Sequence, residues 1–301
     1  MTPVGSSSAL RSAAAAATTG ILVGAGIVAT RAVVDQAGPA SLALMRYLVG
    51  FLCLLPPVLW SGIPRFERRD LLPIGLLGIA QFGILVALLN YALQFIPSAR
   101  AALIFATMPL QTIVLAAALG RERLTTAKLA GVLATIAGVA LALGERAATG
   151  AAHVGIGDLA AFASASSGAL CSVFYRPYLR KYPTLPVSAM AMLASVGFLL
   201  LLAAAEGFFN AVPRFTAGGW LAIGFIGVSS GVGYYCWLWA LNHATPTRVT
   251  VFLALSPITA ALLGAALLAE PVSIPTVLGL ACVVLGLWLA HREPRPAAVS
   301  S

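Results

Sequence analysis

Charged side chains are scarce in this sequence. Of its 301 residues, 9% are Asp, Glu, Lys or Arg, whereas 60% are hydrophobic. A water-soluble domain usually carries about 25% charged residues. Because so little polar side chain is available to cover a globule in water, the composition excludes an ordinary soluble fold. It predicts a protein that crosses a membrane several times.

Groupings of catalytic or metal-binding residues are also missing. The cysteines lie singly in apolar stretches, without CxxC spacing or nearby histidines, at Cys53, Cys171, Cys236 and Cys282. No HExxH or GxxxxGK[ST] motif occurs. These absences argue against a disulfide framework, a metal site and a built-in ATPase, so we expect no metal and no cofactor. A membrane-embedded enzyme is the alternative from another class, but no paired carboxylates or metal cluster at one depth would serve it.

The positive charge has a simple membrane interpretation. A net charge of +9 would suggest nucleic acid as a partner of a soluble protein, but no basic face with interleaved aromatic residues occurs, so we expect none. Of the 18 Lys and Arg residues, 13 fall in loops on one side of the membrane, four fall on the other side, and Arg46 lies within a span. Because cytoplasmic loops are rich in Lys and Arg, both termini are predicted to be cytoplasmic.

Long apolar runs supply the membrane spans. A helix needs about 20 apolar residues to cross the hydrocarbon region. Ten segments are of this kind, at 12–34, 38–60, 71–95, 98–119, 126–144, 157–177, 185–206, 217–242, 246–268 and 273–291. The runs are continuous rather than alternating, which argues against the strands of a membrane barrel.

An internal repeat organises the chain. Residues 94–143 match residues 242–291 without a gap, which pairs Pro109 with Pro257 and Glu122 with Glu270. The same shift divides the chain into repeats 1–148 and 149–301, each with five predicted helices. Because five is odd, the second repeat is inverted relative to the first. The predicted fold class is an all-α polytopic membrane protein with ten transmembrane helices in two inverted five-helix repeats.

The first apolar run has a second interpretation. Arg11 followed by apolar residues also resembles a secretory signal peptide. The run is longer than the apolar part of an ordinary signal peptide, and its removal would leave the first repeat one helix short. We therefore predict that it is a retained transmembrane helix.

Proline interrupts the same helix in each repeat. Pro109 and Pro257 fall in the middle of the spans 98–119 and 246–268. Each lacks the N–H that would bond the carbonyl four residues earlier, at Phe105 or Leu253. A static kink is one interpretation. Because the placement is symmetric, we favour a hinge or gate that lines the transport pathway.

Polar side chains inside the spans are the candidates for substrate binding. They are Gln81, Asn90, Thr107, Gln111, Ser164, Ser167, Tyr234, Trp237, Ser256 and Arg46. In a regular helix, Gln81 and Asn90 would lie on opposite faces, whereas Thr107 and Gln111 would share one face. Arg46 is a charge within the bilayer, which is costly. It either binds a substrate carboxylate or holds a helix end through backbone carbonyls.

Acidic residues are absent from the middle of every predicted span. Asp35, Asp158 and Glu206 all lie near one edge of the membrane. A proton-coupled antiporter usually needs a titratable group near its substrate. The sequence therefore favours transport by a uniporter over a proton-coupled pump.

The repeats resemble a known family. A helix with a central proline is followed by Gly120, Glu122, Leu124 and Thr125 in a Gly-x-Glu-x-Leu-[ST] pattern, and then by a helix with two glycines seven residues apart. This pattern resembles the EamA module of the drug/metabolite transporter (DMT) superfamily. The second copy keeps Pro257, Glu270 and both glycines, but has Ala269 before the glutamate. We interpret Glu122 and Glu270 as helix-end residues.

The resemblance implies a function as well as a fold. It implies a ten-helix inverted-repeat transporter, with a central cavity lined by its first, third, fourth, sixth, eighth and ninth helices. Members of this size in bacterial inner membranes commonly export amino acids and related metabolites, including aromatic amino acids. We therefore expect a monomeric exporter whose partners are a small-molecule substrate and membrane lipids. A proton-coupled drug exporter, a lipid flippase and a structural subunit are the alternatives.

Overall fold

The computed structural model describes residues 6–62, 64–120, 125–147, 152–210, 213–243 and 251–290, and within these ranges it contains helices and no strand. The first half contains α1 (Ser6–Arg31), α2 (Pro39–Ser61), α3 (Arg68–Gly78), the π-helix η1 (Ile79–Ile84), α4 (Leu85–Ala92), α5 (Ser98–Phe105), α6 (Met108–Ala118) and α7 (Thr126–Ala147). The second half contains α8 (Ala152–Phe174), α9 (Arg176–Lys181), α10 (Thr184–Ala205), α11 (Ala217–His243), the 3-10 helix η2 (Val251–Ala254), α13 (Leu255–Leu268) and α14 (Ile274–Ala290).

Within the described ranges, six helices are long and apolar enough to cross a membrane. They are Leu10–Arg31, Pro39–Ser61, Arg68–Ala92, Ser98–Ala118, Gly155–Lys181 and Thr184–Ala205. Shorter apolar helices occur at Thr126–Leu141, Phe252–Leu268 and Ile274–Gly286. The prediction of an all-α polytopic membrane protein is confirmed at this level.

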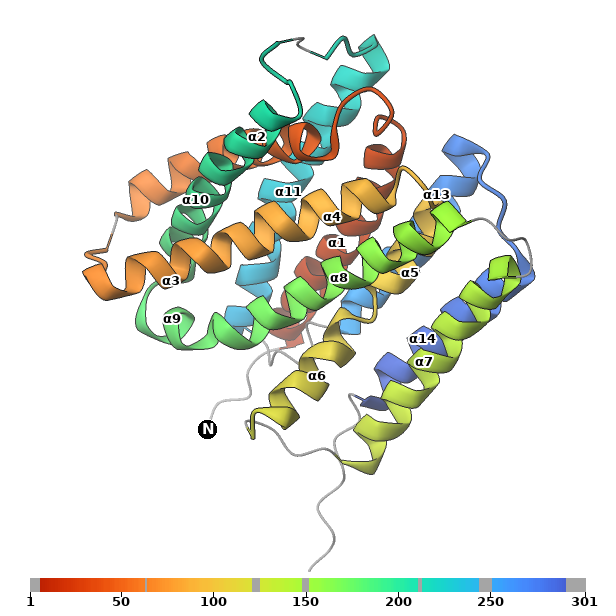
Figure 1. Cartoon of the computed structure of the whole chain (residues 1–301). Coiled ribbons are helices and arrows are strands. Elements are labelled where there is room, and N and C mark those ends of the chain that lie inside the picture. The colour runs from red at the N-terminus through yellow and green to blue at the C-terminus, as the bar shows by residue number, and fades with distance from the viewer. Residues whose placement is uncertain are drawn as a thin grey trace, which may run out of the picture.

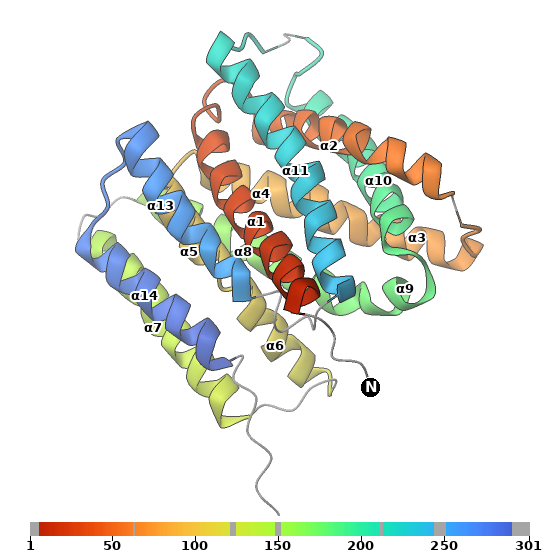
Figure 2. The ribbon, with the colours of Figure 1, turned by 180° about the vertical axis from the view of Figure 1, so that it is seen from behind.

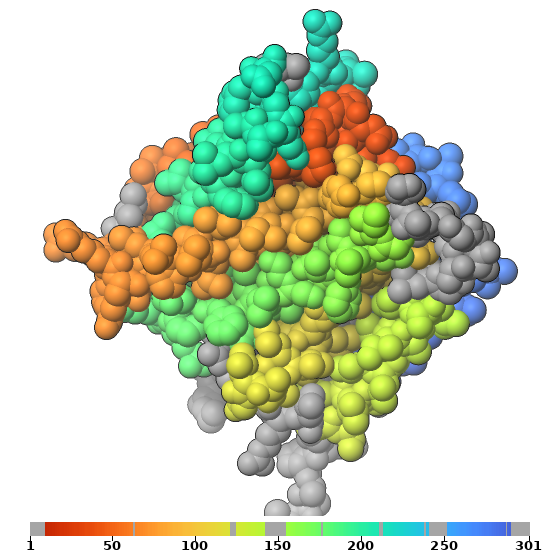
Figure 3. Space-filling view, viewed as in Figure 1, coloured from red at the N-terminus to blue at the C-terminus, as the bar shows by residue number. Residues whose placement is uncertain are grey.

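The helices form two layers closed by a pair at each edge. One layer contains α3–η1–α4, α8 and α5–α6, which lie side by side in Figure 1 and cover one face in Figure 3. The other layer contains α11, α1 and η2–α13, seen from behind in Figure 2. The α2–α10 pair closes one edge and the α7–α14 pair closes the other. Of the ten predicted spans, the third, sixth and fourth therefore form the first layer, and the eighth, first and ninth form the second layer that faces it.

Reciprocal glycine contacts join α7 and α14 at their edge. A Cβ added at Gly138 would lie 2.6 Å from the oxygen of Gly279, and one added at Gly286 would lie 2.6 Å from the oxygen of Gly131. Positions that advance along α7 therefore meet positions that retreat along α14, so the two helices are antiparallel. They lie side by side in both ribbon views (Figures 1 and 2).

Glycines also let α1 and α11 approach their neighbours. A Cβ at Gly20 or Gly24 of α1 would overlap the backbone oxygen of Phe252 or Ser256, and one at Gly227 of α11 would lie 2.5 Å from the Val49 Cβ. Glycine has no Cβ, so helices can pack at this separation. The close helix contact indicated by the two GxxxG matches is present at these positions.

The third span is not a regular helix. Between α3 and α4 the chain forms the π-helix η1, and the Leu85 N–H donates to the Ala80 carbonyl five residues earlier. A π-turn holds an extra residue, so the face presented by later residues is rotated. The argument that placed Gln81 and Asn90 on opposite faces required a regular helix. It does not apply to this segment.

Hydroxyl groups of α8 bond the carbonyls around the π-helix. Ser164 donates to Leu85 O at 2.7 Å and Ser167 donates to Ala80 O at 2.9 Å. Both serines are thus occupied by backbone contacts between helices. In the other layer, Thr19 of α1 donates to Gly233 O at 3.0 Å. Gly233 lies 148 residues after Leu85, which is the spacing of the internal repeat.

The proline interruptions predicted in the fourth and ninth spans are present. Helix α5 ends at Phe105 and α6 begins at Met108, one residue before Pro109. In the second half, the 3-10 segment η2 precedes α13, and Pro257 lies in the first turn of that helix. The Thr107 hydroxyl donates to Ile104 O at 2.7 Å across the first interruption.

Candidate functional site

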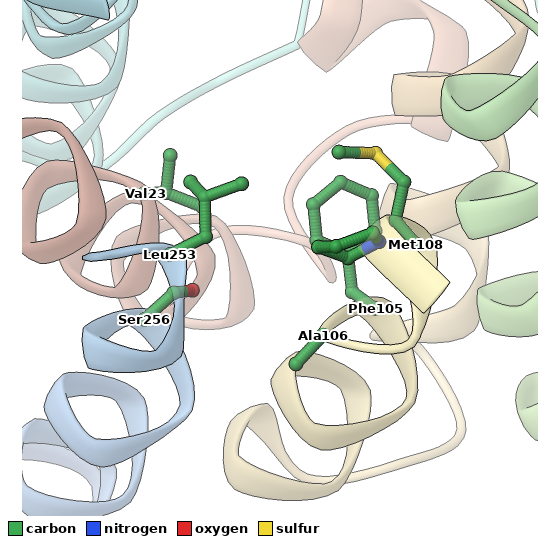
Figure 4. Close-up of a pocket in the computed structure, with 7 residues that line it drawn as sticks. Val23, Phe105, Ala106, Met108, Leu253 and Ser256 are labelled. Atoms are coloured by element: carbon green, nitrogen blue, oxygen red, sulfur yellow. The ribbon is translucent and has the colours of Figure 1, made fainter. Parts of the chain in front are cut away.

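A small cavity lies between the two helix breaks. Its volume is about 10 Å³, and it is lined by Val23, Phe105, Ala106, Met108, Pro109, Leu253 and Ser256. Figure 4 shows side chains of α5–α6 facing those of α1 and η2–α13 across this space. Pockets for small molecules usually measure about 300–1,000 Å³. The cavity holds at most a water molecule, so a larger ligand requires the two layers to separate.

Ser256 contributes an unusual group to this cavity. Ser256 is 3% exposed, and its hydroxyl oxygen has no hydrogen-bond partner among the described residues. A buried hydroxyl without a partner costs free energy, so it is a group that a ligand could satisfy. Thr107 and Gln111 do not line the cavity.

Gln111 connects α6 to α8. Its Nε2 donates to Thr107 Oγ1 at 2.8 Å, and its Oε1 accepts from Ser166 Oγ at 2.7 Å. The predicted pair Thr107 and Gln111 therefore does share one face. Ser166, which was not among the expected site residues, completes this polar group beside the first helix break.

Arg46 lies between α2, α1 and α11. Its Nε donates to Ser230 Oγ at 2.6 Å, and its guanidinium carbon lies 5.7 Å from the centroid of the Tyr47 ring. A Cβ added at Gly26 of α1 would lie 3.7 Å from an Arg46 Nη atom. Within the described ranges, neither a carboxylate nor a backbone carbonyl accepts from Arg46, so the helix-end interpretation has no observed contact.

An aromatic row continues from Arg46 across three helices. The Tyr47 and Phe82 ring centroids are 5.2 Å apart, and those of Phe82 and Tyr234 are also 5.2 Å apart. Tyr234 was expected from its sequence position, whereas Tyr47 and Phe82 were not. They directly follow Arg46 and Gln81 in the chain, but nothing in the apolar sequence around them showed that their rings would meet.

The remaining candidates lie apart from this row. Asn90 is 2% exposed and donates from Nδ2 to Pro39 O at 2.9 Å, where α2 begins. Trp237 packs beside Ala16 of α1. Gln81 is half-buried, and no hydrogen bond involves its side chain within the described ranges. The structure thus brings Arg46 and Tyr234 to one place and puts Asn90 and Trp237 elsewhere.

Three carboxylates bind helix starts or an arginine at one end of the molecule, which we call the Glu270 end. Both oxygens of Glu270 accept from the Ser98 N–H, at 3.1 and 3.0 Å, and the Ser98 hydroxyl also donates to this carboxylate. Glu206 accepts from the N–H groups of Ala40 and Ser41 at 2.9 and 2.8 Å. The helix-end role expected of Glu270 matches this geometry, whereas Glu122 lies outside the described residues.

A bidentate ion pair is the third contact at this end. Arg100 Nε and Nη2 donate to the two oxygens of Asp158 at 2.7 and 2.6 Å. At the opposite end, which we call the Lys181 end, Lys181 contacts Glu67 at 2.5 Å and Asp70 at 2.6 Å. The hydrogen bond from Lys181 holds the pKa of Glu67 below its ordinary value. Among the described residues, no group of three or more His, Cys, Asp or Glu could hold a metal ion.

Comparisons with known proteins agree with this architecture. The chain is 29% identical to a probable terminal-alkyne amino-acid exporter of Streptantibioticus cattleyicolor, over 88% of this chain and 88% of that protein. It is 28% identical to an uncharacterized transporter of Archaeoglobus fulgidus, over 85% of this chain and 89% of that protein. A solved crystal structure with 24% identity superposes with a TM-score of 0.69, covering 93% of this chain and 98% of the other.

The family pattern occurs twice along the chain. The sequence pattern of the EamA-like transporter family matches residues 10–144 and again residues 155–292. These two matches include all the spans and every contact described above. The protein therefore belongs to the EamA-like transporter family.

Proposed function

We propose that this transporter exports amino acids with apolar or aromatic side chains, binding the substrate carboxylate at Arg46. The observation that carries the proposal is the guanidinium group of Arg46, which is bonded through Nε to Ser230 and paired with no carboxylate in the described chain. A charge within a bilayer span is costly and is rarely kept without a function. The planar guanidinium binds a carboxylate through two parallel hydrogen bonds.

The aromatic row would contact the substrate side chain once the helices separate, since Tyr47 and Phe82 are only 5% and 3% exposed in this structure. Tyr47, Phe82 and Tyr234 form consecutive ring contacts that begin at Arg46. Such rings contact apolar and aromatic groups favourably. A molecule with a carboxylate at one end and an apolar body at the other therefore matches the order of groups along this row. The similarity to a probable amino-acid exporter supports the same class of substrate.

Alternating access is the mechanism that the architecture supports. We infer two inverted repeats, 1–148 and 149–301, which are related by the antiparallel α7–α14 pair and the reciprocal Gly138–Gly279 and Gly286–Gly131 contacts. Two equivalent halves provide two states of similar free energy, each open to one side. The breaks before Pro109 and Pro257 border a cavity too small for an amino acid, so we propose that these prolines act as hinges when the layers separate.

Energy coupling and location complete the proposal. The spans carry no carboxylate at mid-depth, so transport is expected to follow the substrate gradient, without ATP, as a uniporter. The charge distribution favours a multi-pass protein of the bacterial inner membrane with both termini in the cytoplasm. Because one chain contains both repeats, it is expected to act as a monomer.

Counterflow into proteoliposomes tests the substrate and the site together. Radiolabelled leucine, phenylalanine and tryptophan should enter vesicles that are preloaded with the same amino acid. Arg46→Gln should lower counterflow at least about tenfold, since a charge-assisted hydrogen bond contributes roughly 1.5–3 kcal/mol. Arg46→Lys should retain part of the activity.

The matched control is Arg65→Gln, which removes the same charge at an exposed loop position and should transport normally. Amino acid counterflow unaffected by Arg46→Gln would contradict the proposed site. A cationic drug or a labelled phospholipid that moves while amino acids do not would favour the drug exporter or the lipid flippase instead.

A further inference from the structure

The hydrogen bonds of Ser230 orient the guanidinium group of Arg46. The Ser230 hydroxyl donates to the carbonyl of Ile226, four residues earlier in α11, at 2.5 Å. The only proton of the hydroxyl is therefore used, and its oxygen accepts from Arg46 Nε at 2.6 Å. Arginine has donors and no acceptor, so the two side chains can bond only in this sense. The Nε edge of the guanidinium is thus held by α11.

Close packing of α11 on α2 brings the short side chain of Ser230 within reach of Arg46. Ser230 lies between Gly227 and Gly231, the glycines of the GxxxG match in this helix. A Cβ added at Gly227 or Gly231 would lie 2.5 or 3.0 Å from a side-chain atom of α2. Larger residues would force the two helices apart and break the serine–arginine bond. The glycines therefore support the Arg46 contact as well as the packing.

The two Nη atoms of Arg46 are the donors that remain. Within the described ranges, Ser230 is the one hydrogen-bond partner of Arg46, and it contacts Nε alone. Arg46 is half-buried. A carboxylate can bind end-on to two Nη atoms through parallel, charge-assisted hydrogen bonds. Fixing Nε leaves this end of the guanidinium free and holds it in one direction.

Open space adjoins this end of the guanidinium at Gly26 of α1. A Cβ added at Gly26 would lie 3.7 Å from Arg46 Nη2 and 3.9 Å from Ser229 Oγ, which are ordinary contacts. At Gly24, two positions earlier, an added Cβ would instead overlap a backbone oxygen. Gly26 is buried, so the room beside it lies inside the protein and is bordered by a cation and a hydroxyl.

Ser229 is placed to act as a further donor in this space. It is 7% exposed, and its hydroxyl donates to the Ile226 carbonyl at 3.1 Å. The same carbonyl also accepts the shorter bond from Ser230. Ser229 can therefore turn its proton toward a ligand without leaving the carbonyl unpaired.

We propose that Ser230 is a positioning residue for Arg46, and that the substrate carboxylate binds end-on in the space beside Gly26, with Ser229 as a further donor. This inference rests on the proposed function and adds how the arginine is aligned and where the carboxylate lies. Gly26 is then a specificity-determining residue, because a side chain at this position fills the space that the carboxylate needs. The subsite lies where α1 and α2 of the first half meet α11 of the second.

Equilibrium binding of radiolabelled leucine to the purified protein tests the role of Ser230. Leucinamide, in which an amide replaces the carboxylate, is the competitor. The parent protein should bind leucine at least about tenfold more tightly than leucinamide, since only leucine offers a charge to Arg46. Ser230→Ala should weaken leucine binding by roughly fivefold and leave leucinamide binding unchanged. Ser172→Ala, which removes a hydroxyl bonded to its own helix, should bind both as the parent does.

A double variant shows whether Ser230 acts through Arg46. Once the arginine is gone, a positioning residue has nothing to align, so Ser230→Ala in the Arg46→Gln background should cause no further loss of leucine binding. A residue that only stabilises the fold would lower binding by the same factor in both backgrounds. Double-mutant analysis of the dissociation constants separates the two roles.

Gly26→Ala tests the space assigned to the carboxylate. The added methyl should weaken leucine binding by roughly tenfold, because it lies where the carboxylate is expected and costs at least one charge-assisted hydrogen bond. Gly233→Ala is the matched control. A Cβ at this buried position of α11 would also make only ordinary contacts, with Leu22 at 3.6 and 3.7 Å, and leucine binding should stay at the parent value.

Leucine binding that is unchanged in Ser230→Ala, or reduced by equal factors in the two backgrounds, would overturn the positioning role. Unchanged binding in Gly26→Ala would overturn the assigned space. Failure of the proposed function looks different, because Arg46→Gln would then bind leucine as well as the parent does. A parent protein that binds no leucine would overturn both proposals.

Discussion

Single glycines determine how closely α1 approaches the broken helix of the second half. Gly20 and Gly24 face the backbone oxygens of Phe252 and Ser256 without room for a Cβ. Backbone cannot move aside as the end of a flexible side chain can. The contact of α1 with η2 and α13 within this layer is therefore sensitive to single substitutions.

Gly24→Ala should destabilise the protein by about 1–3 kcal/mol, because the added methyl overlaps Ser256 O and forces α1 away from α13. The midpoint of thermal unfolding in detergent measures the effect. Gly224→Ala is the matched control, since nothing lies within 4 Å of a Cβ at that position of α11. A midpoint for Gly24→Ala equal to that of Gly224→Ala would mean that the contact between α1 and α13 relaxes without cost.

Serines on α8 show why a polar residue in a span need not contact the substrate. Ser164 and Ser167 were expected to line a cavity, yet both donate to backbone carbonyls around η1. Removing such a donor takes away one hydrogen bond of a carbonyl inside the helix interface. The same serines therefore stabilise the irregular helix that carries Gln81 and Phe82.

Ser164→Ala should lower the free energy of unfolding by about 1–2 kcal/mol, because the Leu85 carbonyl loses its donor in a fully buried contact. Ser172→Ala is the control, since Ser172 is exposed and bonds the Gly168 carbonyl of its own helix. Thermal unfolding of the two variants should differ. Equal midpoints would show that water or neighbouring donors satisfy Leu85.

At the scale of the helices, the two breaks are the feature that we connect with transport. The interruption before Pro109 and the one before Pro257 both border the small cavity in Figure 4. Because proline cannot donate to the carbonyl of the preceding turn, we propose that each break acts as a joint within a membrane helix. Motion at the two joints together would widen the cavity.

Pro109→Ala should slow transport several-fold while leaving thermal stability unchanged or higher, since a restored N–H and a better helix former stiffen the joint. Initial rates of counterflow and unfolding midpoints, measured on the same sample, separate the two effects. Pro56→Ala removes an exposed proline from α2, away from the cavity, and should not slow transport. Full activity of Pro109→Ala would exclude a hinge at this position.

The sequence predicted the all-helical architecture, the breaks and the helix contacts of the glycines, because apolar length, proline and GxxxG act locally or through spacing. It did not predict η1, since the apolar residues of this segment include no residue that demands a π-turn. The ring contacts of Tyr47 and Phe82 were equally hidden, because they join helices far apart in the chain. The partners of Asn90 and Ser164 depend on the same long-range packing.

At the scale of the whole molecule, the predicted spans carry no carboxylate at mid-depth, and this bears on what drives transport. The carboxylates described in contacts above lie at the two ends of the molecule, where they bind backbone N–H groups or basic side chains. None is placed to exchange a proton with a substrate in the middle of the membrane. This agrees with the proposal that the substrate gradient itself drives transport.

Uptake into proteoliposomes driven only by an amino acid gradient should proceed at the same rate with and without a pH difference across the membrane. A protonophore should leave this rate unchanged, since no proton moves with the substrate. A sodium gradient of the same size is the parallel control. Strict dependence on the pH gradient would indicate a proton-coupled exporter.

The exchange of glycine contacts between α7 and α14 has a consequence for the origin of the chain. A contact that is unchanged when its two sides are swapped is what two identical subunits make across a twofold axis. Gly138 on Gly279 and Gly286 on Gly131 are such a contact, now made within one polypeptide. Gene duplication and fusion would have turned the interface of an ancestral antiparallel dimer into an internal edge of a single chain. Afterwards each half was free to diverge.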